Sequence, residues 1–330
     1  MDVGLYTDSV GGLSFEEALD FAASIGTRGI EIAAGGQSPA PHMRVFDLVE
    51  DSAARRTFVE AFNRRGLRIA ALNCSAWPLH PVVGDRHTEI IKATIRLAGQ
   101  IGVTKIVTMS GTPGDAPSAP TVNWIWYPWP EDAVALLDRQ WEETIRYWRD
   151  MDRFAGEHGI ERIAFELHPL HLAYNVPTLL RMREAVGPRI GANVDPSHMF
   201  WQQMDPVAVI DALGPAVHHV HLKDTKLVPD QVAIAGVLDQ RTFLDPKQRA
   251  WVFRTVGRGH DAAFWGSFVD ALRRVGYDDV LSIENEDVAQ DPMAGCTEAA
   301  EFMYQFLAAV PNQPWPSGEE GARSLRTEEQ

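Results

Sequence analysis

Short apolar segments alternate with longer amphipathic segments along most of the chain. The short segments are rich in β-branched and apolar residues and have the length of strands, whereas the longer ones show the apolar spacing of helices. Ser14 suits the N-cap of a helix over 15–25, and Gly276 suits the end of a helix over 264–275. Eight strand segments can be counted, at residues 3–6, 29–32, 68–72, 105–109, 162–166, 191–195, 218–221 and 280–284. The pattern predicts an α/β fold, a closed (β/α)8 TIM barrel.

Two connections in this pattern are longer than the loops usual in βα units. They cover residues 110–130 after the fourth strand and 225–261 after the seventh, and we expect such long insertions to shape a substrate site. The first insertion is rich in aromatic residues, namely Trp124, Trp126, Tyr127 and Trp129. These rings suit stacking on a sugar or aryl group, and they equally suit packing of the loop against the barrel.

The chain has 330 residues, of which 45% are hydrophobic, and this is enough for one large core. We therefore expect a single catalytic domain over residues 1–310. The following segment, 311–330, is polar and contains Pro, Gly and Glu, so we expect a flexible or partner-bound tail.

Charge and cysteine content narrow the classes of function. There are 30 Lys and Arg residues against 45 Asp and Glu residues, and the net charge of -15 would repel a nucleic acid backbone. No apolar run approaches the roughly 20 residues that span a membrane, and the N-terminus lacks a signal pattern. Cys74 and Cys296 are the two cysteines, which we expect to be buried free thiols. These observations predict a cytoplasmic protein with a small-molecule substrate.

Four of the predicted strands each end in a residue that can bind a metal ion. These residues are Glu166, Asp195, His221 and Glu284. A single acidic residue at a strand end often only caps the next helix, but the C-terminal ends of barrel strands open onto one face, so four such residues converge on one cavity. Three carboxylates and one imidazole form an oxygen-rich set that suits Mn²⁺ or Mg²⁺ better than structural Zn²⁺. The sequence therefore predicts a catalytic metal site, with Co²⁺ as a further possible occupant.

Two histidines follow the predicted ligands closely. His168 comes after Glu166 in the run Glu-Leu-His-Pro, where its imidazole could serve as a general base because its ordinary pKa lies near neutrality, or could support a ligand. His198 follows Asp195 in the run Asp-Pro-Ser-His, where it could hydrogen-bond a substrate or cap the loop.

Further polar residues lie at the same predicted rim. Lys223 and Asp224 could pair with each other or orient the ligands. Arg258 lies between two glycines and could hold a hydroxyl, carboxylate or phosphate, or could pair with surface acids, and His260 follows it. Weaker candidates for lining the cavity are Glu31, Asn73 and Trp77.

At these residues the chain resembles the sugar phosphate isomerase/epimerase superfamily of xylose isomerase-like barrels. The resemblance covers most of residues 1–309 and is carried by the motifs AFELHP, NVDPSH, HVHLKD, GRGHD and SIENED. It implies a Mn²⁺-type ion bound by the four ligands above, a sugar-like substrate, and a contact between His198 and that substrate.

Within the superfamily, the resemblance differs from branch to branch. The ketose 3-epimerases, in which the two metal-bound glutamates move the proton, carry a further Glu and an Arg near the positions where this chain has Leu172 and Leu227. The endonuclease branch has additional metal-binding histidines where this chain has Asn73 and Met109. A third branch, the α subunits of C-glycoside deglycosidases, acts with a small β-subunit partner, and the Trp-rich insertion fits the bulky glycoside of that branch.

This resemblance leads us to expect a lyase that acts on a glycoside oxidised at sugar C3. The metal would stabilise the enolate, a base would remove the C2 proton, and the electron pair would expel the aglycone from C1. We expect His168 as the base, with Glu166 or Glu284 as alternatives, while His198, Arg258, His260, Lys223 and Trp126 would contact the substrate. The alternative is a sugar isomerase or epimerase that forms the same enediolate, and a third possibility is a barrel that binds a sugar or a protein without catalysis.

Overall fold

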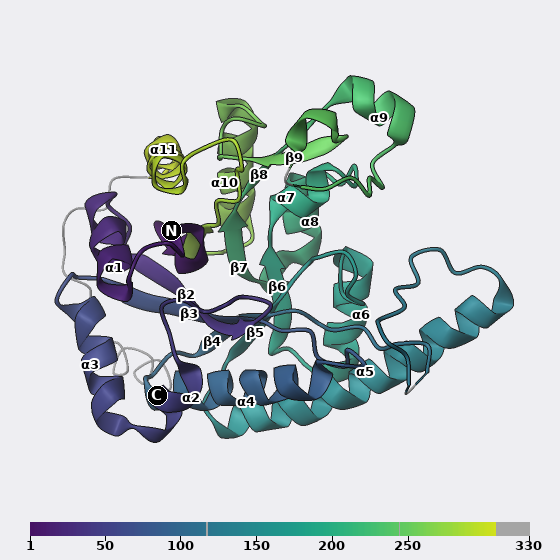
Figure 1. The fold of residues 1–330 in the computed structure, drawn as a ribbon, viewed down its shortest axis with the longest axis horizontal. Helices are drawn as coiled ribbons and strands as arrows, with labels where there is room; N and C mark the ends of the chain where they lie inside the picture. The colour runs from purple at the N-terminus through teal and green to yellow at the C-terminus, as the bar shows by residue number, and fades with distance from the viewer. Residues whose placement is uncertain (117, 244, 308–330) are drawn as a thin grey trace, which may run out of the picture.

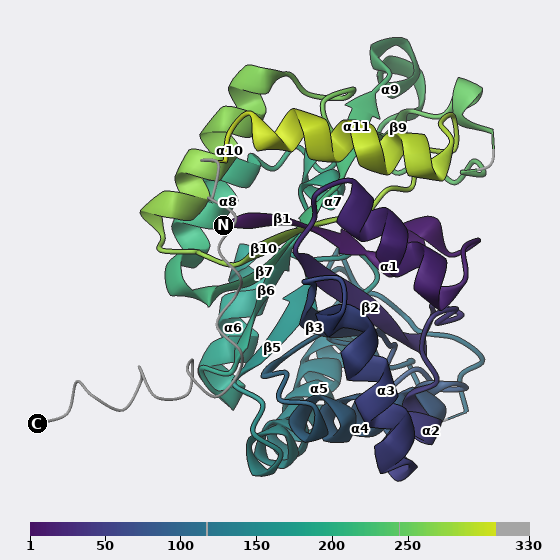
Figure 2. The ribbon, with the colours of Figure 1, turned by 90° about the vertical axis from the view of Figure 1, so that its left-hand side faces the viewer.

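The computed structural model describes residues 1–307 except 117 and 244, and its centre is a closed barrel of parallel strands (Figures 1 and 2). Around the barrel the strands follow the order β1, β10, β7, β6, β5, β4, β3, β2. Their bounds are β1 Asp2–Tyr6, β2 Gly29–Gly36, β3 Arg68–Ser75, β4 Lys105–Thr108, β5 Arg162–Glu166, β6 Ile190–Val194, β7 Val217–Leu222 and β10 Val280–Ile283. The predicted TIM barrel is thus confirmed. The expected tail, 311–330, lies outside the described residues.

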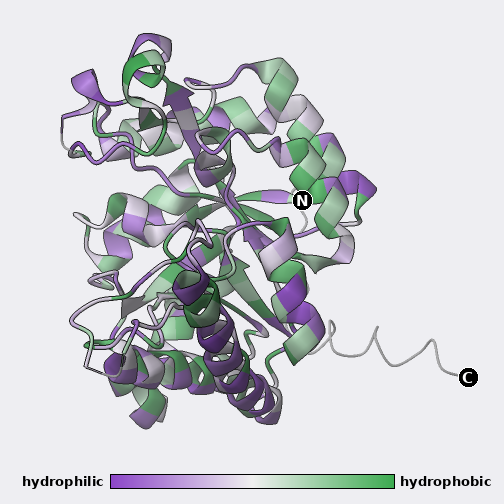
Figure 3. Ribbon diagram, turned by 90° about the vertical axis from the view of Figure 1, so that its right-hand side faces the viewer, coloured by the Kyte–Doolittle hydropathy of each residue, from purple (hydrophilic) through white to green (hydrophobic). Residues whose placement is uncertain are grey.

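Helices cover the outside of the barrel. They are α1 Phe15–Ser24, α2 Val45–Glu50, α3 Ser52–Asn63, α4 Gly84–Gln100, α5 Glu131–Glu157, α6 Val176–Val186, α7 Pro196–Phe200, α8 Pro206–Leu213, α10 Ala262–Arg274 and α11 Pro292–Tyr304. Ser14 caps α1, since its hydroxyl accepts a hydrogen bond from Glu17 N while the Glu17 side chain accepts from Ser14 N. Figure 3 shows that hydrophobic residues dominate the interior and hydrophilic stretches lie on the surface helices.

The core lies between the strands and their helices, and fully buried aromatic residues fill part of it. Trp148 of α5 packs edge-on against Phe165 of β5 with ring centres 4.5 Å apart, and its indole donates a hydrogen bond to Ser110 O. Cys74 and Cys296 are buried free thiols, as expected. Among the described residues, no helix is both long and apolar enough to cross a membrane.

The two long connections lead in different directions. The segment between β4 and α5 runs out to the N-terminal end of α5, a helix of 27 residues that extends well beyond the barrel (Figure 1). The segment between β7 and α10 instead folds over the barrel. It contains a two-stranded antiparallel sheet of β8 Asp224–Leu227 and β9 Trp251–Arg254, and between these strands lie α9 Pro229–Ala235 and the short 3-10 helix Pro246–Gln248.

At the opposite face, where the strands begin, Asp279 holds two cations. Its carboxylate contacts Arg68 at 2.5 Å and Lys105 at 2.8 Å, and Lys105 is buried. Burial alone would raise the pKa of Asp279, but Lys105 and Arg68 outweigh it and lower the pKa below its usual range. This end of a TIM barrel serves stability rather than chemistry.

We predict that Asp279→Asn destabilises the fold by about 3 to 5 kcal/mol at pH 7, because it leaves the buried Lys105 ammonium without its counter-charge. Since the pKa of Asp279 is lowered on folding, the ion pair stabilises the protein above an unfolded-state pKa of about 3.9 and loses this effect as the pH falls further. Urea unfolding at pH 7 and pH 3 should therefore give a large difference between wild type and variant at pH 7 and a smaller one at pH 3.

The matched control is Asp270→Asn, which breaks an exposed pair with Arg273 and should cost less than about 1 kcal/mol. Equal effects of the two substitutions would contradict this account of the barrel base.

Candidate metal centre

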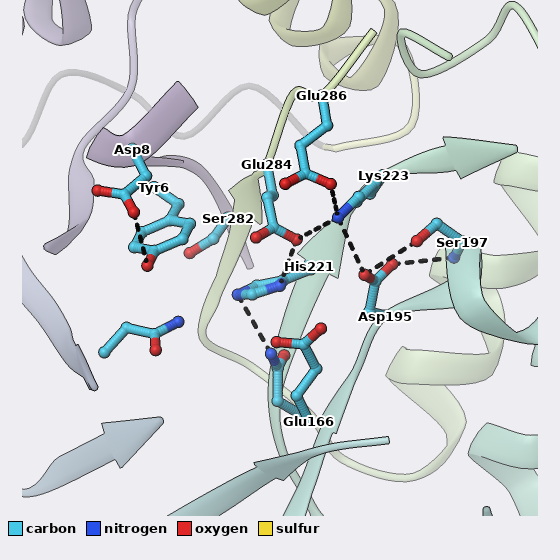
Figure 4. A network of polar contacts seen from close by, with 12 residues as sticks. Tyr6, Asp8, Glu166, Asp195, Ser197, His221, Lys223, Ser282, Glu284 and Glu286 are labelled. Carbon is cyan, nitrogen blue, oxygen red and sulfur yellow. Dashed lines mark hydrogen bonds and ion pairs between the residues drawn. The ribbon is translucent and has the colours of Figure 1, made fainter. Parts of the chain in front are cut away.

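The four predicted metal ligands meet at the C-terminal end of the barrel (Figure 4). Glu166 ends β5, Asp195 directly follows β6, His221 lies in β7 and Glu284 directly follows β10. One ligand atom from each lies within 4.8 Å of those of the other three. Ligands on opposite sides of an ion at about 2.2 Å are about 4.4 Å apart. A shift of a few tenths of an ångström would therefore let all four share one cation.

The donor set and its charges fit a divalent cation. Burial, with the nearby charge of Glu284, raises the pKa of Glu166 well above its ordinary value. Burial also raises the pKa of Asp195 to about 6, although Lys223 opposes this shift. For Glu284, Lys223 and His221 outweigh burial and lower the pKa to about 2. Crowded carboxylates in a buried site repel one another, and a cation relieves that repulsion.

Lys223 supplies part of the positive charge at this site. Its ammonium lies 3.2 Å from Glu284 Oε2, 2.5 Å from Glu286 Oε2 and 3.9 Å from Asp195 Oδ2 (Figure 4). The side chain is buried and lines the cavity above the ligands. Lys223 therefore faces the carboxylates rather than pairing with Asp224.

A buried polar layer inside the barrel holds His221 from below. Glu31 Oε2 lies 2.7 Å from His219 Nε2, and both Glu31 oxygens lie 3.1 to 3.2 Å from His221 Nε2. Asn73 donates to Glu31, and Asn193 Nδ2 lies 3.1 Å from His221 Nε2. With Nε2 engaged here, Nδ1 of His221 faces Glu284 Oε2 at 3.0 Å. Such a carboxylate contact orients a histidine toward a metal ion.

His219 is a site residue that the sequence analysis missed. It is two residues before His221 in β7, and the alternation of a strand turns both side chains into the barrel. The spacing His-Val-His was therefore a signal for it. Together with Glu31, these histidines form a second group whose ligand atoms lie within 4.8 Å of one another. This group adjoins that of the four predicted ligands through His221, and a third group of Glu166, His168 and His198 adjoins it through Glu166.

Two further histidines stand beside the ligands and line the cavity. His198 Nε2 lies 3.1 Å from Glu166 Oε1 and 3.2 Å from Asp195 Oδ2. His168 Nδ1 lies 2.5 Å from Pro169 O, and since a carbonyl can only accept, Nδ1 carries the proton and Nε2 is left with a free lone pair. Burial lowers the pKa of His168, so the neutral form is favoured. His168 thus has the protonation state of a general base.

A cavity of about 1160 Å³ opens above the ligands. Its walls come mainly from the loops after β1, β2, β5, β6 and β10 and from the insertion after β7. The described lining includes Tyr6, Asp8, Gln37, Pro41, Met109, Glu166, His168, His198, Trp201, Lys223, Phe243, Arg249, Trp251, Phe253, Glu284, Glu286, Asp287 and Val288. It exceeds the ~300–1,000 Å³ that usually encloses a drug-sized ligand.

His260, expected to contact substrate, lies outside the described lining of the cavity and contacts Asp224. Its Nδ1 lies 2.7 Å from Asp224 Oδ1, and Asp224 Oδ2 accepts backbone hydrogen bonds from Gly257, Gly259 and His260. A Cβ on Gly259 would lie 2.4 Å from Asp224 Oδ1. The glycines therefore allow the backbone to close around this carboxylate, which ties the returning insertion to β8.

Arg258 and Trp126 are also displaced from the expected substrate site. Arg258 forms a two-point ion pair with Glu298 at 2.7 Å for each contact. Trp126 is 56% exposed, and neither residue belongs to the described lining of the cavity. Trp126 lies in the insertion between β4 and α5, which runs out toward the N-terminal end of this long helix (Figure 1).

Comparison of this chain with known proteins identifies its family. A sequence profile described as xylose isomerase-like TIM barrel matches residues 19–306, and the chain belongs to this family. It is 39% identical over 312 residues to the uncharacterized protein YfiH of Bacillus subtilis (strain 168), covering 93% of this chain and 100% of YfiH.

Solved structures share the fold at lower identity. The probable 3-DHS dehydratase AsbF from Bacillus anthracis, involved in petrobactin synthesis, superposes with a TM-score of 0.64 and 19% identity, covering 92% of this chain and 99% of AsbF. An L-ribulose 3-epimerase superposes with a TM-score of 0.62 and 16% identity, covering 100% of this chain and 99% of the epimerase. At these identities, both similarities show a shared fold.

We predict that Glu31→Gln lowers Mn²⁺ affinity by about 10- to 100-fold, because the lost negative charge no longer orients His221. Isothermal titration calorimetry with MnCl2 measures this, alongside circular dichroism to check folding. Glu298→Gln removes a carboxylate outside the cavity and should leave Mn²⁺ affinity unchanged. A folded Glu31→Gln variant with wild-type affinity would show that Glu31 does not position the ligand.

Proposed function

We propose that the protein is a divalent-metal-dependent enzyme that removes a proton from the carbon next to a sugar carbonyl, as a sugar isomerase or epimerase. The observation that carries the proposal is the convergence of Glu166, Asp195, His221 and Glu284 below a large cavity, with His168 Nε2 available beside them. Membership of the xylose isomerase-like family and the likeness to an L-ribulose 3-epimerase support it.

We infer Mn²⁺ as the metal, with Mg²⁺ and Co²⁺ as alternatives, because three carboxylates and one imidazole suit these ions. Held by the four ligands, the ion supplies Lewis-acid stabilisation of negative charge that develops on a substrate oxygen. The residues around the ion then do the remaining work of binding and proton transfer.

In this proposal, His168 Nε2 accepts the proton from the substrate carbon. Its Nδ1–H remains hydrogen-bonded to Pro169 O, which fixes the ring as the proton arrives. His198 and Lys223 face the same space and hold substrate hydroxyls. Glu166 and Glu284 are the alternative bases, and return of a proton on the other face or at the neighbouring carbon gives the epimer or isomer.

A second candidate function is the lyase reaction on a 3-oxo-glycoside, which begins with the same proton removal but ends in loss of the aglycone. Proton removal at C2 is followed by formation of a C1–C2 double bond and departure of the aglycone with the electron pair. The size of the cavity favours this candidate, because a free sugar would fill only part of about 1160 Å³. The likeness to the probable 3-DHS dehydratase AsbF is compatible with this candidate. A small β subunit, which the resemblance to the deglycosidases implies, is the partner proposed for it.

We predict metal-dependent exchange of a carbon-bound hydrogen when the protein and MnCl2 are incubated in D2O with free ketoses or with a phenyl 3-oxo-glucoside. Proton NMR would follow the exchange and distinguish epimerised ketose from released phenol. His168→Gln should lower kcat by about 10²- to 10⁴-fold while Mn²⁺ affinity stays unchanged, because a general base is lost and the ligands remain.

Glu284→Gln should lower both kcat and Mn²⁺ affinity, and Trp126→Ala, outside the cavity, should leave both unchanged. Exchange that persists after metal removal by a chelator would contradict the proposed function. If His168→Gln instead exchanges hydrogen at the wild-type rate, the base is Glu166 or Glu284.

A further inference from the structure

The insertion after β7 builds an aromatic wall on one side of the cavity. Trp251 and Phe253 lie in β9, and Phe243 lies in the segment that leads to it. Trp201 and Trp251 are stacked with ring centres 4.9 Å apart, and Phe243 and Phe253 are stacked at 5.8 Å. We call these four residues the aromatic wall.

The aromatic wall is continuous with the candidate metal centre. Phe253 contacts His198 edge to face, with ring centres 5.7 Å apart. The Lys223 ammonium, which also contacts Glu284, lies 4.4 Å from the centre of the Phe253 ring. A sugar held at the metal ligands would therefore have Phe253 beside it, and any substituent pointing this way would meet Phe243 next.

Phe243 is exposed yet held in place. Its side chain is 48% exposed, while the Arg249 guanidinium lies 3.8 Å from its ring centre and 4.7 Å from that of Trp251. Arg249 is itself buried and donates hydrogen bonds to the backbone oxygens of Arg241 and Trp251. The wall thus presents a supported ring to the cavity, where an apolar partner would bury it at little conformational cost.

The charges of the cavity select against an anionic substituent. Its described lining contains the five carboxyl groups of Asp8, Glu166, Glu284, Glu286 and Asp287 but only two cationic side chains, those of Lys223 and Arg249. Lys223 already faces Glu284 and Glu286, and Arg249 lies against Phe243 and the backbone. A phosphate group would meet an excess of carboxylates over cations in this lining, so the charge balance favours a neutral substituent.

We propose that the aromatic wall is a binding subsite for the flat apolar aglycone of an uncharged glycoside. The sugar ring of this substrate lies at the metal ligands and its aglycone stacks on Phe243 and Phe253. This inference rests on the proposed function, in its second form on a 3-oxo-glycoside, for the position of the sugar, and it names the class of aglycone that the enlarged cavity accepts.

The test is a binding measurement with the full chain loaded with Mn²⁺, using phenyl β-D-glucopyranoside and methyl β-D-glucopyranoside as probes. Isothermal titration calorimetry should show the phenyl glucoside binding about tenfold more tightly, as expected for one added aromatic stack of about 1.4 kcal/mol. Phe243→Ala should remove this preference and Phe243→Leu should reduce it. Trp126→Ala, which removes a similarly exposed ring outside the cavity, should leave it unchanged.

Equal affinity for the two glucosides, or binding of neither, would overturn the subsite, as would a preference that survives Phe243→Ala. Phenyl 6-phospho-β-D-glucopyranoside should bind more weakly than the phenyl glucoside, and tighter binding would overturn the neutral substrate class. Failure of the proposed function shows separately, as absence of metal-dependent hydrogen exchange, whereas failure of the subsite alone leaves that exchange intact.

Discussion

Mutual repulsion among buried carboxylates at the mouth of the barrel is the constraint on which the rest of the structure depends. Glu166, Asp195 and Glu284 come from three separate strands, and the closed barrel forces them together with His221. Charges of one sign are costly to bury without partners. The ammonium of Lys223 and the imidazole of His221 offset part of this repulsion. The arrangement still suits one more cation.

This constraint also explains the polar layer below the ligands. Glu31 and His219 are wholly buried in the barrel interior, where apolar residues would pack more simply. Glu31 contacts His221 Nε2 and so fixes the ring that presents Nδ1 to Glu284, while His219 contacts Glu31 in turn. At the other end of the barrel, the ion pairs of Asp279 serve stability alone. Function and stability are thus separated along the barrel axis.

Strand ends were the most predictable part of this protein. The C-terminal ends of all strands in a parallel barrel lie at the same face. The convergence of Glu166, Asp195, His221 and Glu284 could therefore be predicted from the sequence alone. The fold followed from the same periodicity. His219 could have been found by the same reasoning, because its position differs from that of His221 by one strand repeat.

Long insertions were less predictable, because their course depends on tertiary packing. The Trp-rich segment before α5 and the segment before β9 both carry exposed aromatic rings, but only the second folds over the cavity. The glycines around Arg258 resemble a ligand-binding turn, yet they accommodate the Asp224 carboxylate. Glycines in a sequence indicate that the backbone can lie close to another group. Only the fold shows whether that group is a ligand or a side chain of the protein.

Anomalous diffraction from crystals soaked in MnCl2, recorded at the manganese edge, would locate the bound ion. We expect one strong peak at about 2.0 to 2.3 Å from the carboxylate oxygens of Glu166, Asp195 and Glu284 and from His221 Nδ1. A peak at Glu31 and His219 instead, or no peak among the four ligands, would contradict this expectation.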